Sequence, residues 1–363
     1  MTKLFKYKKT LLVFFLILLV VSGVIFSKPL SSLLIKHVVR QKMTRLHLES
    51  VDGLHAVLCG TGTPLPDRER VGPCIAVIAG KHLYIVDAGE GSVRNMILTG
   101  LPAGKIEAIL LTHFHSDHIA SLGNLMMQRW TNGTNTKPVD IIGPEGVETV
   151  VAGFNQAYKL DSGYRTAHHG AEIFPPSGAG GVARPFKLGP EDDASVVVLN
   201  KDGLKITAFK VDHRPVAPAV GYRFDYRGRS LVVSGDTIPC PSLVRHSRGA
   251  DLLLHEAVQA SIVKMIEDEY RASSNFALAK IMSDIPGYHT TVENAARIAR
   301  DAGVKHLALY HILPPLPSSF ILHHVFLGDA RKYYPGPVTI GVDGMLISLP
   351  AGNNEIKVKK LFN

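Results

Sequence analysis

Three histidines and an aspartate lie within six positions of one another in the segment Thr112-His113-Phe114-His115-Ser116-Asp117-His118. The segment follows the apolar run Ile106 to Leu111, which has the composition of a buried strand. Imidazole and carboxylate groups gathered on one turn are the ligands that zinc-like cations take, and burying them together without a cation is costly. The sequence therefore predicts a metal site at the end of this strand, in preference to a polar loop with chance histidines.

Three more residues of ligand type come just after later β-type runs. They are His213, Asp236 and His311. Two metal ions need more ligands than one loop supplies, and loops at one edge of a sheet can meet there. A lone histidine in such a place is usually structural. Three such residues together with the first cluster favour a shared metal centre.

The elements that must position these residues are short β-type runs separated by glycine and proline, with helical patterns between them. One helix is predicted over Val292 to Asp301, with Thr290 or Thr291 as its N-cap. Two strand series, each followed by helices, indicate an α/β (or α+β) fold with two sheets packed face to face and helices outside. The predicted strands are Leu54 to Leu58, Cys74 to Ala79, Leu83 to Val86, Ala108 to Leu111 and Val139 to Ile142 in the first series, and Leu204 to Val211, Val220 to Phe224, Ser230 to Val233, Leu252 to Leu254, Leu307 to Tyr310 and Val338 to Ile340 in the second.

The stretch from Phe154 to Ala194 interrupts this pattern. It contains Pro175-Pro176 and the glycine-rich segment Gly178 to Gly181. An insertion of this length in a compact domain is usually a lid, a binding loop or a disordered spacer. The sequence alone does not predict which of these the segment forms.

An apolar run of sixteen residues, Leu11 to Phe26, follows a basic N-terminus. It is slightly short of the ~20 residues that span a bilayer, and no small-x-small cleavage site follows it. We predict a signal anchor or transmembrane segment over residues 1–28, with cleavage and secretion as the alternative. Residues 29–50 are predicted as a basic linker helix, either on a membrane surface or solvated. The remaining domain, residues 51–363, would then be exported to a periplasmic or extracellular location.

The net charge of +9 belongs mostly to the N-terminal segment. Residues Met1 to Ser50 contain nine lysines and arginines and a single acid, Glu49, so the rest of the chain carries only about +1. A surface that binds tRNA or DNA is expected to have a basic excess of its own. This distribution predicts that nucleic acid is an unlikely partner.

The chain resembles the metallo-β-lactamase superfamily, and within it the branch that holds ribonuclease Z and the metal-dependent arylsulfatases. The resemblance implies an αββα sandwich with two divalent metal ions in a cleft between the sheets; zinc is expected, with manganese as the alternative. The motifs that carry it lie in family order: Gly60-Thr61-Gly62-Thr63-Pro64, Val86-Asp87-Ala88-Gly89-Glu90-Gly91, Thr112 to His118, Val211-Asp212-His213, Ser234-Gly235-Asp236-Thr237, His255-Glu256-Ala257 and Tyr310-His311.

Carried over by position, the resemblance implies a complete ligand set. It gives His113, His115 and His213 to one ion, Asp117, His118 and His311 to the other, and Asp236 to both as a bridge. A carboxylate can bridge two metals, and a water between them becomes a hydroxide nucleophile near neutral pH.

The resemblance also implies residues that move protons. His255 corresponds to a histidine near the scissile bond in the ribonuclease Z pattern, and we predict it as the general acid, with Glu256 setting its charge and tautomer. Asp117 belongs to this catalytic set as well as to the ligands. The position after Ala257 is Val258, where the ribonuclease Z pattern has threonine, so the mechanism is not expected to be an exact copy.

Asp87 and His289 each have two predicted roles, one in the metal site and one purely structural. Asp87 is predicted to orient a metal ligand, or else to form the turn beside Gly89. His289 is predicted to contact a substrate oxyanion, or else to close the N-terminus of the helix that begins near Val292.

The substrate class is predicted from the sequence features that differ from the ribonuclease Z pattern. The near-neutral body, the few lysines of the insertion and the sequence Ile312-Leu313-Pro314-Pro315 after His311 all favour the arylsulfatase-like members. We predict a membrane-anchored hydrolase acting on small anionic sulfate or phosphate esters, as an arylsulfatase or a phosphodiesterase. The alternatives are a ribonuclease Z-type tRNA 3′ endonuclease, a lactone or β-lactam hydrolase, and a non-catalytic metal-containing ligand-binding protein. A homodimer is compatible with the sequence.

Overall fold

The structure is a computed structural model that describes residues 14–18, 21–23, 27, 31–39, 52–317 and 319–362. The chain divides into two units, Met1–Leu46 and His47–Asn363, and each is described by itself. In the first unit, residues 14–18, 21–23, 27 and 31–39 are helical. The predicted anchor (residues 1–28) and linker helix (residues 29–50) both extend over residues outside the described ones. Among the helices that the structure describes, none has the length and apolar character needed to cross a membrane.

The second unit contains two β-sheets. The first sheet has the strand order β15-β14-β1-β2-β3-β4-β5-β6, and the second has the order β13-β12-β11-β10-β9-β8-β7. The strands of the first sheet are β1 (Gly53–Gly60), β2 (Cys74–Ala79), β3 (His82–Val86), β4 (Ile106–Leu110), β5 (Val139–Pro144), β6 (Gly181–Phe186), β14 (Met345–Pro350) and β15 (Lys357–Lys360). Those of the second are β7 (Ser195–Lys201), β8 (Leu204–Lys210), β9 (Val220–Tyr226), β10 (Arg229–Val233), β11 (Leu252–Val258), β12 (His306–Leu313) and β13 (Val338–Ile340).

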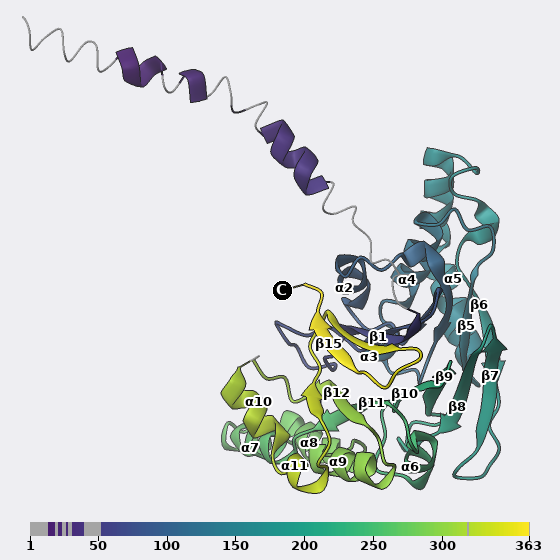
Figure 1. Cartoon of the computed structure of the whole chain (residues 1–363), viewed down its shortest axis with the longest axis vertical. Helices are drawn as coiled ribbons and strands as arrows, with labels where there is room; N and C mark the ends of the chain where they lie inside the picture. Colours follow the sequence, from purple (N-terminus) through teal and green to yellow (C-terminus); the bar gives the residue numbers. More distant parts are fainter. Residues whose placement is uncertain are drawn as a thin grey trace, which may run out of the picture. The chain divides into compact units, whose positions relative to one another are not determined.

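Helices cover the outer faces of the two sheets (Figure 1). Those beside the first sheet are α2 (Ser92–Leu98), α3 (Ser116–Ile119), α4 (Leu122–Thr131) and α5 (Val147–His169). Those beside the second are α6 (Pro241–Ser247), α7 (Ala260–Ala272), α8 (Phe276–Asp284), α9 (Val292–Asp301), α10 (Phe320–Leu327) and α11 (Ala330–Tyr333). Short 3-10 turns occupy Ala103–Lys105, Pro176–Gly178 and Ile285–Gly287.

The core lies between the sheets. Buried side chains of the first sheet, such as Leu54 and Tyr84, share one apolar cluster with Ile206 and Tyr222 of the second. A separate apolar cluster packs α9 beneath the second sheet. This confirms the predicted sandwich of two sheets with helices outside.

The predicted helix over Val292 to Asp301 is α9, and its N-cap is Thr291. The Thr291 side chain accepts a hydrogen bond from the backbone N–H of Asn294 at 3.3 Å. The helix buries Val292, Ala295, Ala296, Ile298 and Ala299 on one face, which is the pattern of a helix packed on a sheet.

The stretch from Phe154 to Ala194 is largely regular structure. Residues up to His169 continue helix α5, and Gly181–Phe186 forms strand β6, the last strand of its sheet. Pro185 lies inside this strand, which is tolerated because an edge strand needs fewer ladder donors. The sequence prediction omitted β6 and also β7, β14 and β15. At the opposite edge, β15 is exposed along its whole length and contains Lys357, Lys359 and Lys360.

A hydrogen bond between the sheets holds the start of the histidine segment. The hydroxyl of Tyr222 donates to the backbone oxygen of Leu111 at 2.7 Å, in a buried position. We expect Tyr222→Phe to lower the free energy of unfolding by about 1–2 kcal/mol, because the Leu111 carbonyl loses a buried donor. Urea denaturation measures the change. Tyr226→Phe is the matched control, because its hydroxyl binds Asp52 in a partly exposed position. Equal losses in both variants would contradict the prediction.

Candidate metal centre

The predicted ligands come from four separate loops or strand ends. The histidine segment joins β4 to α3, His213 lies beyond β8, and Asp236 lies beyond β10. The backbone oxygen of Thr112 accepts a hydrogen bond from the N–H of Val220 at 3.0 Å, so the first loop is tied to β9. Gly235 has φ 62, and a Cβ there would lie 2.6 Å from the Val220 oxygen, so this position requires glycine.

His311 is placed by an irregularity inside a strand. The pairing of β12 with β11 shifts between Glu256 and Ala257, so that Tyr310 and Ile312 have partners and His311 is skipped. His311 has φ 49, in the left-handed region that few residues other than glycine adopt. A bulge of this kind redirects one side chain out of the regular alternation.

One group of ligand atoms comes from His113, His115 and His213. The Nδ1 of His115 lies 3.0 Å from the Nε2 of His113 and 3.4 Å from the Nε2 of His213. Together with an oxygen of Asp236, these atoms all lie within 4.8 Å of one another.

A second group comes from Asp117, His118 and His311. The Oδ2 of Asp117 lies 3.3 Å from the Nε2 of His311 and 3.5 Å from the Nε2 of His118. The three ligand atoms lie within 4.8 Å of one another.

Asp236 lies between the two groups. Its Oδ2 is 3.9 Å from the Nε2 of His113 and 4.0 Å from that of His213. The same oxygen is 3.3 Å from the Nε2 of His118 and 3.4 Å from that of His311. The structure thus brings all seven predicted ligands together around one buried carboxylate.

The polar groups of this centre fit a divalent cation. The Nε2 of His118, the Oδ1 of Asp236 and the Nδ1 of His311 are buried and have no hydrogen-bond partner among the described residues. Buried polar atoms without partners are costly. Imidazole nitrogens with carboxylates are also the donor set that zinc-like ions prefer.

Electrostatics at the centre follow from burial and mutual contact. Burial and the neighbouring His118 hold the pKa of His113 well below its ordinary value, which keeps it in the neutral form that binds metals. Burial opposes the charged form of Asp236, but His311 and His118 outweigh it and hold the pKa of this carboxyl well below its usual range. His118 has its pKa raised because Asp236 and Asp117 outweigh burial.

Asp87 orients His118, in line with the first of its two predicted readings. Its Oδ2 lies 2.8 Å from the Nδ1 of His118 and also accepts from the Thr112 hydroxyl at 2.8 Å. Its Oδ1 accepts the N–H of Thr112 at 2.8 Å. His213 is oriented likewise by the backbone oxygen of Tyr288, 2.9 Å from its Nδ1. Sequence patterns contain no signal for a contact to a backbone oxygen.

We expect Asp87→Asn to weaken metal affinity about 10- to 100-fold while the fold is retained. Asparagine tolerates the φ of 59 at this position. Its amide can offer His118 either an oxygen or an NH₂ group, but it no longer fixes the Nδ1–H tautomer as a carboxylate does. Metal titration monitored by isothermal calorimetry measures the effect. Unchanged affinity would reduce Asp87 to the turn-forming role.

The Glu256 carboxylate has a different partner from the one predicted. Its Oε1 lies 3.2 Å from the Nδ1 of His289 and accepts the N–H of Thr290 at 2.8 Å. The ring of His255 instead meets the backbone oxygen of Glu256, 2.6 Å from its Nδ1. His255 is fully buried, and burial lowers its pKa. Glu256 therefore orients His289 through its side chain, while its backbone oxygen meets the His255 ring and its charge partly offsets the lowering of the His255 pKa by burial.

His289 lies close to the ligands. Its ligand atom is within 4.8 Å of those of Asp236 and His311. Burial disfavours its charged form, but the Glu256 carboxylate more than offsets this and raises the pKa of His289 to about 9. This pKa favours the protonated form of His289 near neutral pH.

The centre opens into a cavity of about 240 Å³. His115, Asp117, Asp236, His289 and His311 supply its polar wall. The rest is mainly apolar: Pro64, Leu65, Ile281, Ile285, Tyr288 and Leu313. A group bound at the polar wall would be partly shielded from water.

Comparison with known proteins places the chain in a family. Residues 82–312 match the beta-lactamase superfamily domain. Ribonuclease Z of Mycobacterium sp. (strain KMS) is 38% identical over 264 residues, which cover 72% of this chain and 85% of that protein. Ribonuclease Z of Mycobacterium avium (strain 104) is 38% identical over 292 residues, 80% of this chain and 96% of that protein.

The chain belongs to the ribonuclease Z branch of the metallo-β-lactamase superfamily.

Solved structures of this superfamily share the fold. The short form of human tRNase Z has a TM-score of 0.58 at 22% identity, over 82% of this chain and 99% of that one. YhfI from Bacillus subtilis, a metallo-beta-lactamase fold protein, has a TM-score of 0.58 at 21% identity, over 82% and 100%. Membership of the superfamily identifies the chain as a metal-dependent hydrolase that binds divalent cations.

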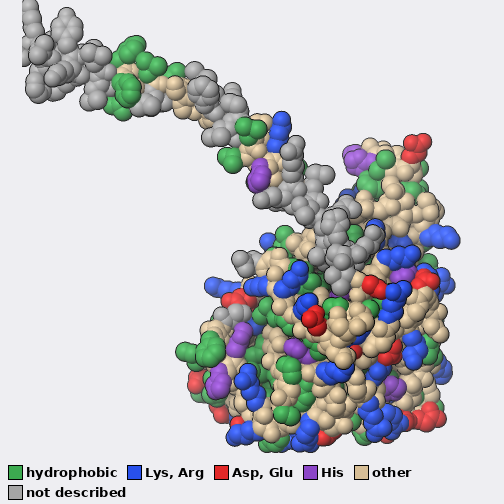
Figure 2. Space-filling model, in the orientation of Figure 1, with side chains coloured by type: hydrophobic (Ala, Val, Ile, Leu, Met, Phe, Trp, Pro, Cys, Tyr) green, Lys and Arg blue, Asp and Glu red, His purple; other side chains and the backbone are tan. Residues whose placement is uncertain are grey.

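The relatives overturn two predictions about substrate. Small sulfate or phosphate esters as the main substrates are contradicted, because the relatives that match most of the chain are named ribonuclease Z. The expectation that nucleic acid is an unlikely partner is wrong for the same reason. The net charge of the body did not predict nucleic-acid binding. Lysines and arginines are spread over its visible face among acidic residues (Figure 2). Bound cations would also add positive charge that is not counted in the sequence.

The predicted location is also contradicted. A membrane-anchored, exported catalytic domain, or a secreted form of it, would be separated from the RNA that a ribonuclease cleaves, and the relatives are ribonucleases by name.

Proposed function

We propose that this protein is a ribonuclease Z-type endonuclease that hydrolyses a phosphodiester bond at the 3′ side of precursor tRNA. The observation that carries the proposal is the 38% identity to enzymes named ribonuclease Z, which extends over 85% to 96% of their length. The hydrolase domain is residues 51–363.

In the proposed site, His113, His115 and His213 would hold one cation, and Asp117, His118 and His311 would hold the other. Asp236 would serve both, a role that its central position supports. Two such cations, when bound, polarise a phosphoryl oxygen and make water a better nucleophile. The histidine-rich ligand set favours zinc, and elemental analysis of the purified protein tests this.

The chain's own side chains have separate tasks in the proposed reaction. Asp87 keeps His118 in one orientation. Glu256 holds His289 in its protonated form, and His289 donates a proton to the leaving 3′ oxygen of the RNA. The apolar wall formed by Ile281, Ile285 and Leu313 excludes water from one side of the reacting phosphate.

Incubation of the full chain with precursor tRNA, in the presence of zinc or manganese, tests the proposal. The expected result is one endonucleolytic cut that releases the 3′ trailer, with no such cut by His115→Ala. The KM of the wild-type protein for precursor tRNA should rise with salt concentration, because RNA binding releases counterions. Metal-loaded protein that hydrolyses a small aryl phosphodiester but leaves precursor tRNA intact would overturn the proposed substrate.

A further inference from the structure

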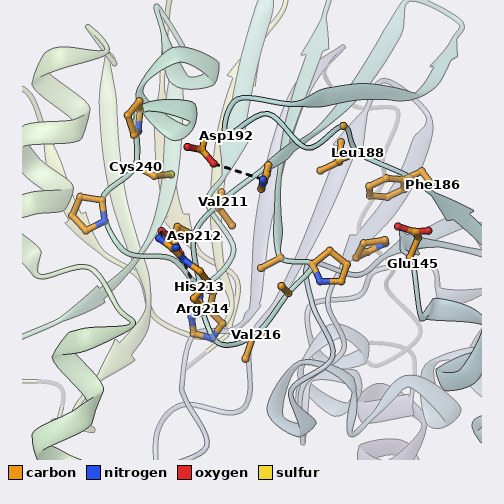
Figure 3. Close-up of a pocket in the computed structure, with 18 residues that line it drawn as sticks. Glu145, Phe186, Leu188, Asp192, Val211, Asp212, His213, Arg214, Val216 and Cys240 are labelled. Carbon is orange, nitrogen blue, oxygen red and sulfur yellow. Dashed lines mark hydrogen bonds and ion pairs between the residues drawn. The ribbon is translucent and has the colours of Figure 1, made fainter.

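A larger cavity, of about 610 Å³, adjoins the metal centre (Figure 3). His213 lines it and also belongs to the first group of metal ligands. On its other side, His213 contacts Tyr288, which lines the smaller cavity of the metal centre. His213 and Tyr288 thus form a shared boundary between the two spaces. None of the roles assigned above uses the larger cavity.

The walls of this cavity are mainly apolar. Phe186 and Leu188 lie together on one side, and Cys240 lies on the opposite side (Figure 3). The ring of Phe186 is only partly buried and stands edge to face with Tyr222 at 81°, with the ring centroids 6.5 Å apart. The cavity is also lined by Val216, Ala217, Pro218, Pro239 and Pro241. Such a surface suits the flat face of a ring.

The charged groups at the rim neutralise one another. Arg214 binds Asp212 through two contacts, at 2.6 Å and 2.9 Å. Lys210 lies 3.7 Å from Asp192. Both cationic side chains of the lining therefore already have carboxylate partners, and Glu145 adds a further acid. A phosphate would meet no net positive charge here, whereas the metal centre next to it supplies that charge.

We propose that this cavity binds a nucleobase of the RNA substrate, while the phosphate to be cut lies at the metal centre. The proposal rests on the proposed function for its substrate class. The apolar walls stack on the base, and the paired charges of the rim offer hydrogen-bond donors and acceptors to its edge. The cavity thereby positions one nucleotide beside the scissile bond.

Direct binding tests the cavity without requiring cleavage. Saturation-transfer NMR of the full chain is recorded with adenosine, uridine and, as a control, ribose, each at millimolar concentration. Signals are expected from a nucleoside's base protons and not from ribose. Ala217→Trp should abolish them, because the exposed alanine lines the cavity and the larger side chain fills it. Absence of any nucleoside signal, or signals that persist in Ala217→Trp, would overturn the proposal.

Steady-state kinetics provides the second test. Phe186→Ala and Ala217→Trp should each raise the KM for precursor tRNA about tenfold, the size expected for the loss of one stacked base. The ratio of kcat/KM for RNA to that for an aryl phosphodiester, which has no base, should fall by the same factor. Ala272→Trp, an exposed position at the end of α7 outside both cavities, is the matched control. Equal losses on both substrates would indicate a structural effect and overturn the proposal.

The two hypotheses fail in different ways. A wild-type protein that binds a nucleoside in the cavity but cuts no precursor tRNA would refute the proposed function and leave the nucleobase-binding cavity supported. A protein that cuts precursor tRNA with kinetics insensitive to Phe186→Ala and Ala217→Trp would refute the cavity's role and leave the proposed function supported.

Discussion

Asp236→Ala is expected to lose both metal ions and at least about 10³-fold of turnover. The Oδ2 of Asp236 lies within 4.0 Å of histidine nitrogens of both groups. Without this carboxylate, each group keeps three ligands, and the charge that offsets two cations is lost at the midpoint. The rate effect follows because two-metal chemistry stabilises both the attacking and the leaving oxygen.

Metal content by mass spectrometry and single-turnover cleavage rates measure these two effects, and circular dichroism checks that the variant is folded. Asp161→Ala is the matched control, because Asp161 lies on α5 and forms an exposed pair with Arg165, of the kind that contributes little. A folded Asp236→Ala protein that retains two equivalents of metal would refute the bridging role.

His289→Ala is expected to lower turnover about 10²- to 10⁴-fold while metal content stays near normal, the range for loss of a general acid. The reason is that the pKa of His289, raised to about 9, makes it a proton donor at neutral pH. The effect should depend on the leaving group. An RNA 3′ oxygen needs the proton, whereas an aryl oxide does not, so an aryl phosphodiester should lose much less.

The pH profile gives an independent readout of this role. The acid form of His289 is present below its pKa, so activity should fall as the pH rises through about 9. Removing the Glu256 carboxylate by Glu256→Gln removes the group that raises this pKa, and the alkaline limb should then move to lower pH. His324→Ala, an exposed histidine of α10, should leave the profile unchanged. A profile that does not move in Glu256→Gln would show that another group donates the proton.

Most of the metal centre could be predicted because its residues obey local rules. Ligand-type side chains just after strands must emerge at a sheet edge, and this reasoning named His213, Asp236 and His311 without any structure. What could not be read was the bulge that redirects His311, since no residue near it marks the shift in pairing.

Strand geometry explains why the Glu256 side chain hydrogen-bonds His289 and not its neighbour His255. His255 and Glu256 are neighbours in β11, and successive side chains in a strand point to opposite faces. Neighbours in sequence are therefore poor candidates for a side-chain pair. The real partner, His289, lies 33 positions away and reaches Glu256 only because the segment before α9 packs against β11.

Two of the strands that the sequence prediction omitted, β6 and β15, have weak local patterns. β6 contains a proline, and β15 is a run of four exposed residues, three of them lysine. Such sequences lack the apolar alternation that marks a strand, because they form the two ends of their sheet and need bury little.

These end strands also affect how the molecule behaves at high concentration. An unpaired strand edge is a template on which a second molecule can continue the sheet. Here the added strand would have to approach three lysines at β15, or at β6 a proline that offers no N–H. The eight-stranded sheet is thus protected against open-ended polymerisation at both ends, and replacing Lys357 and Lys359 with threonine would remove that protection at one of them.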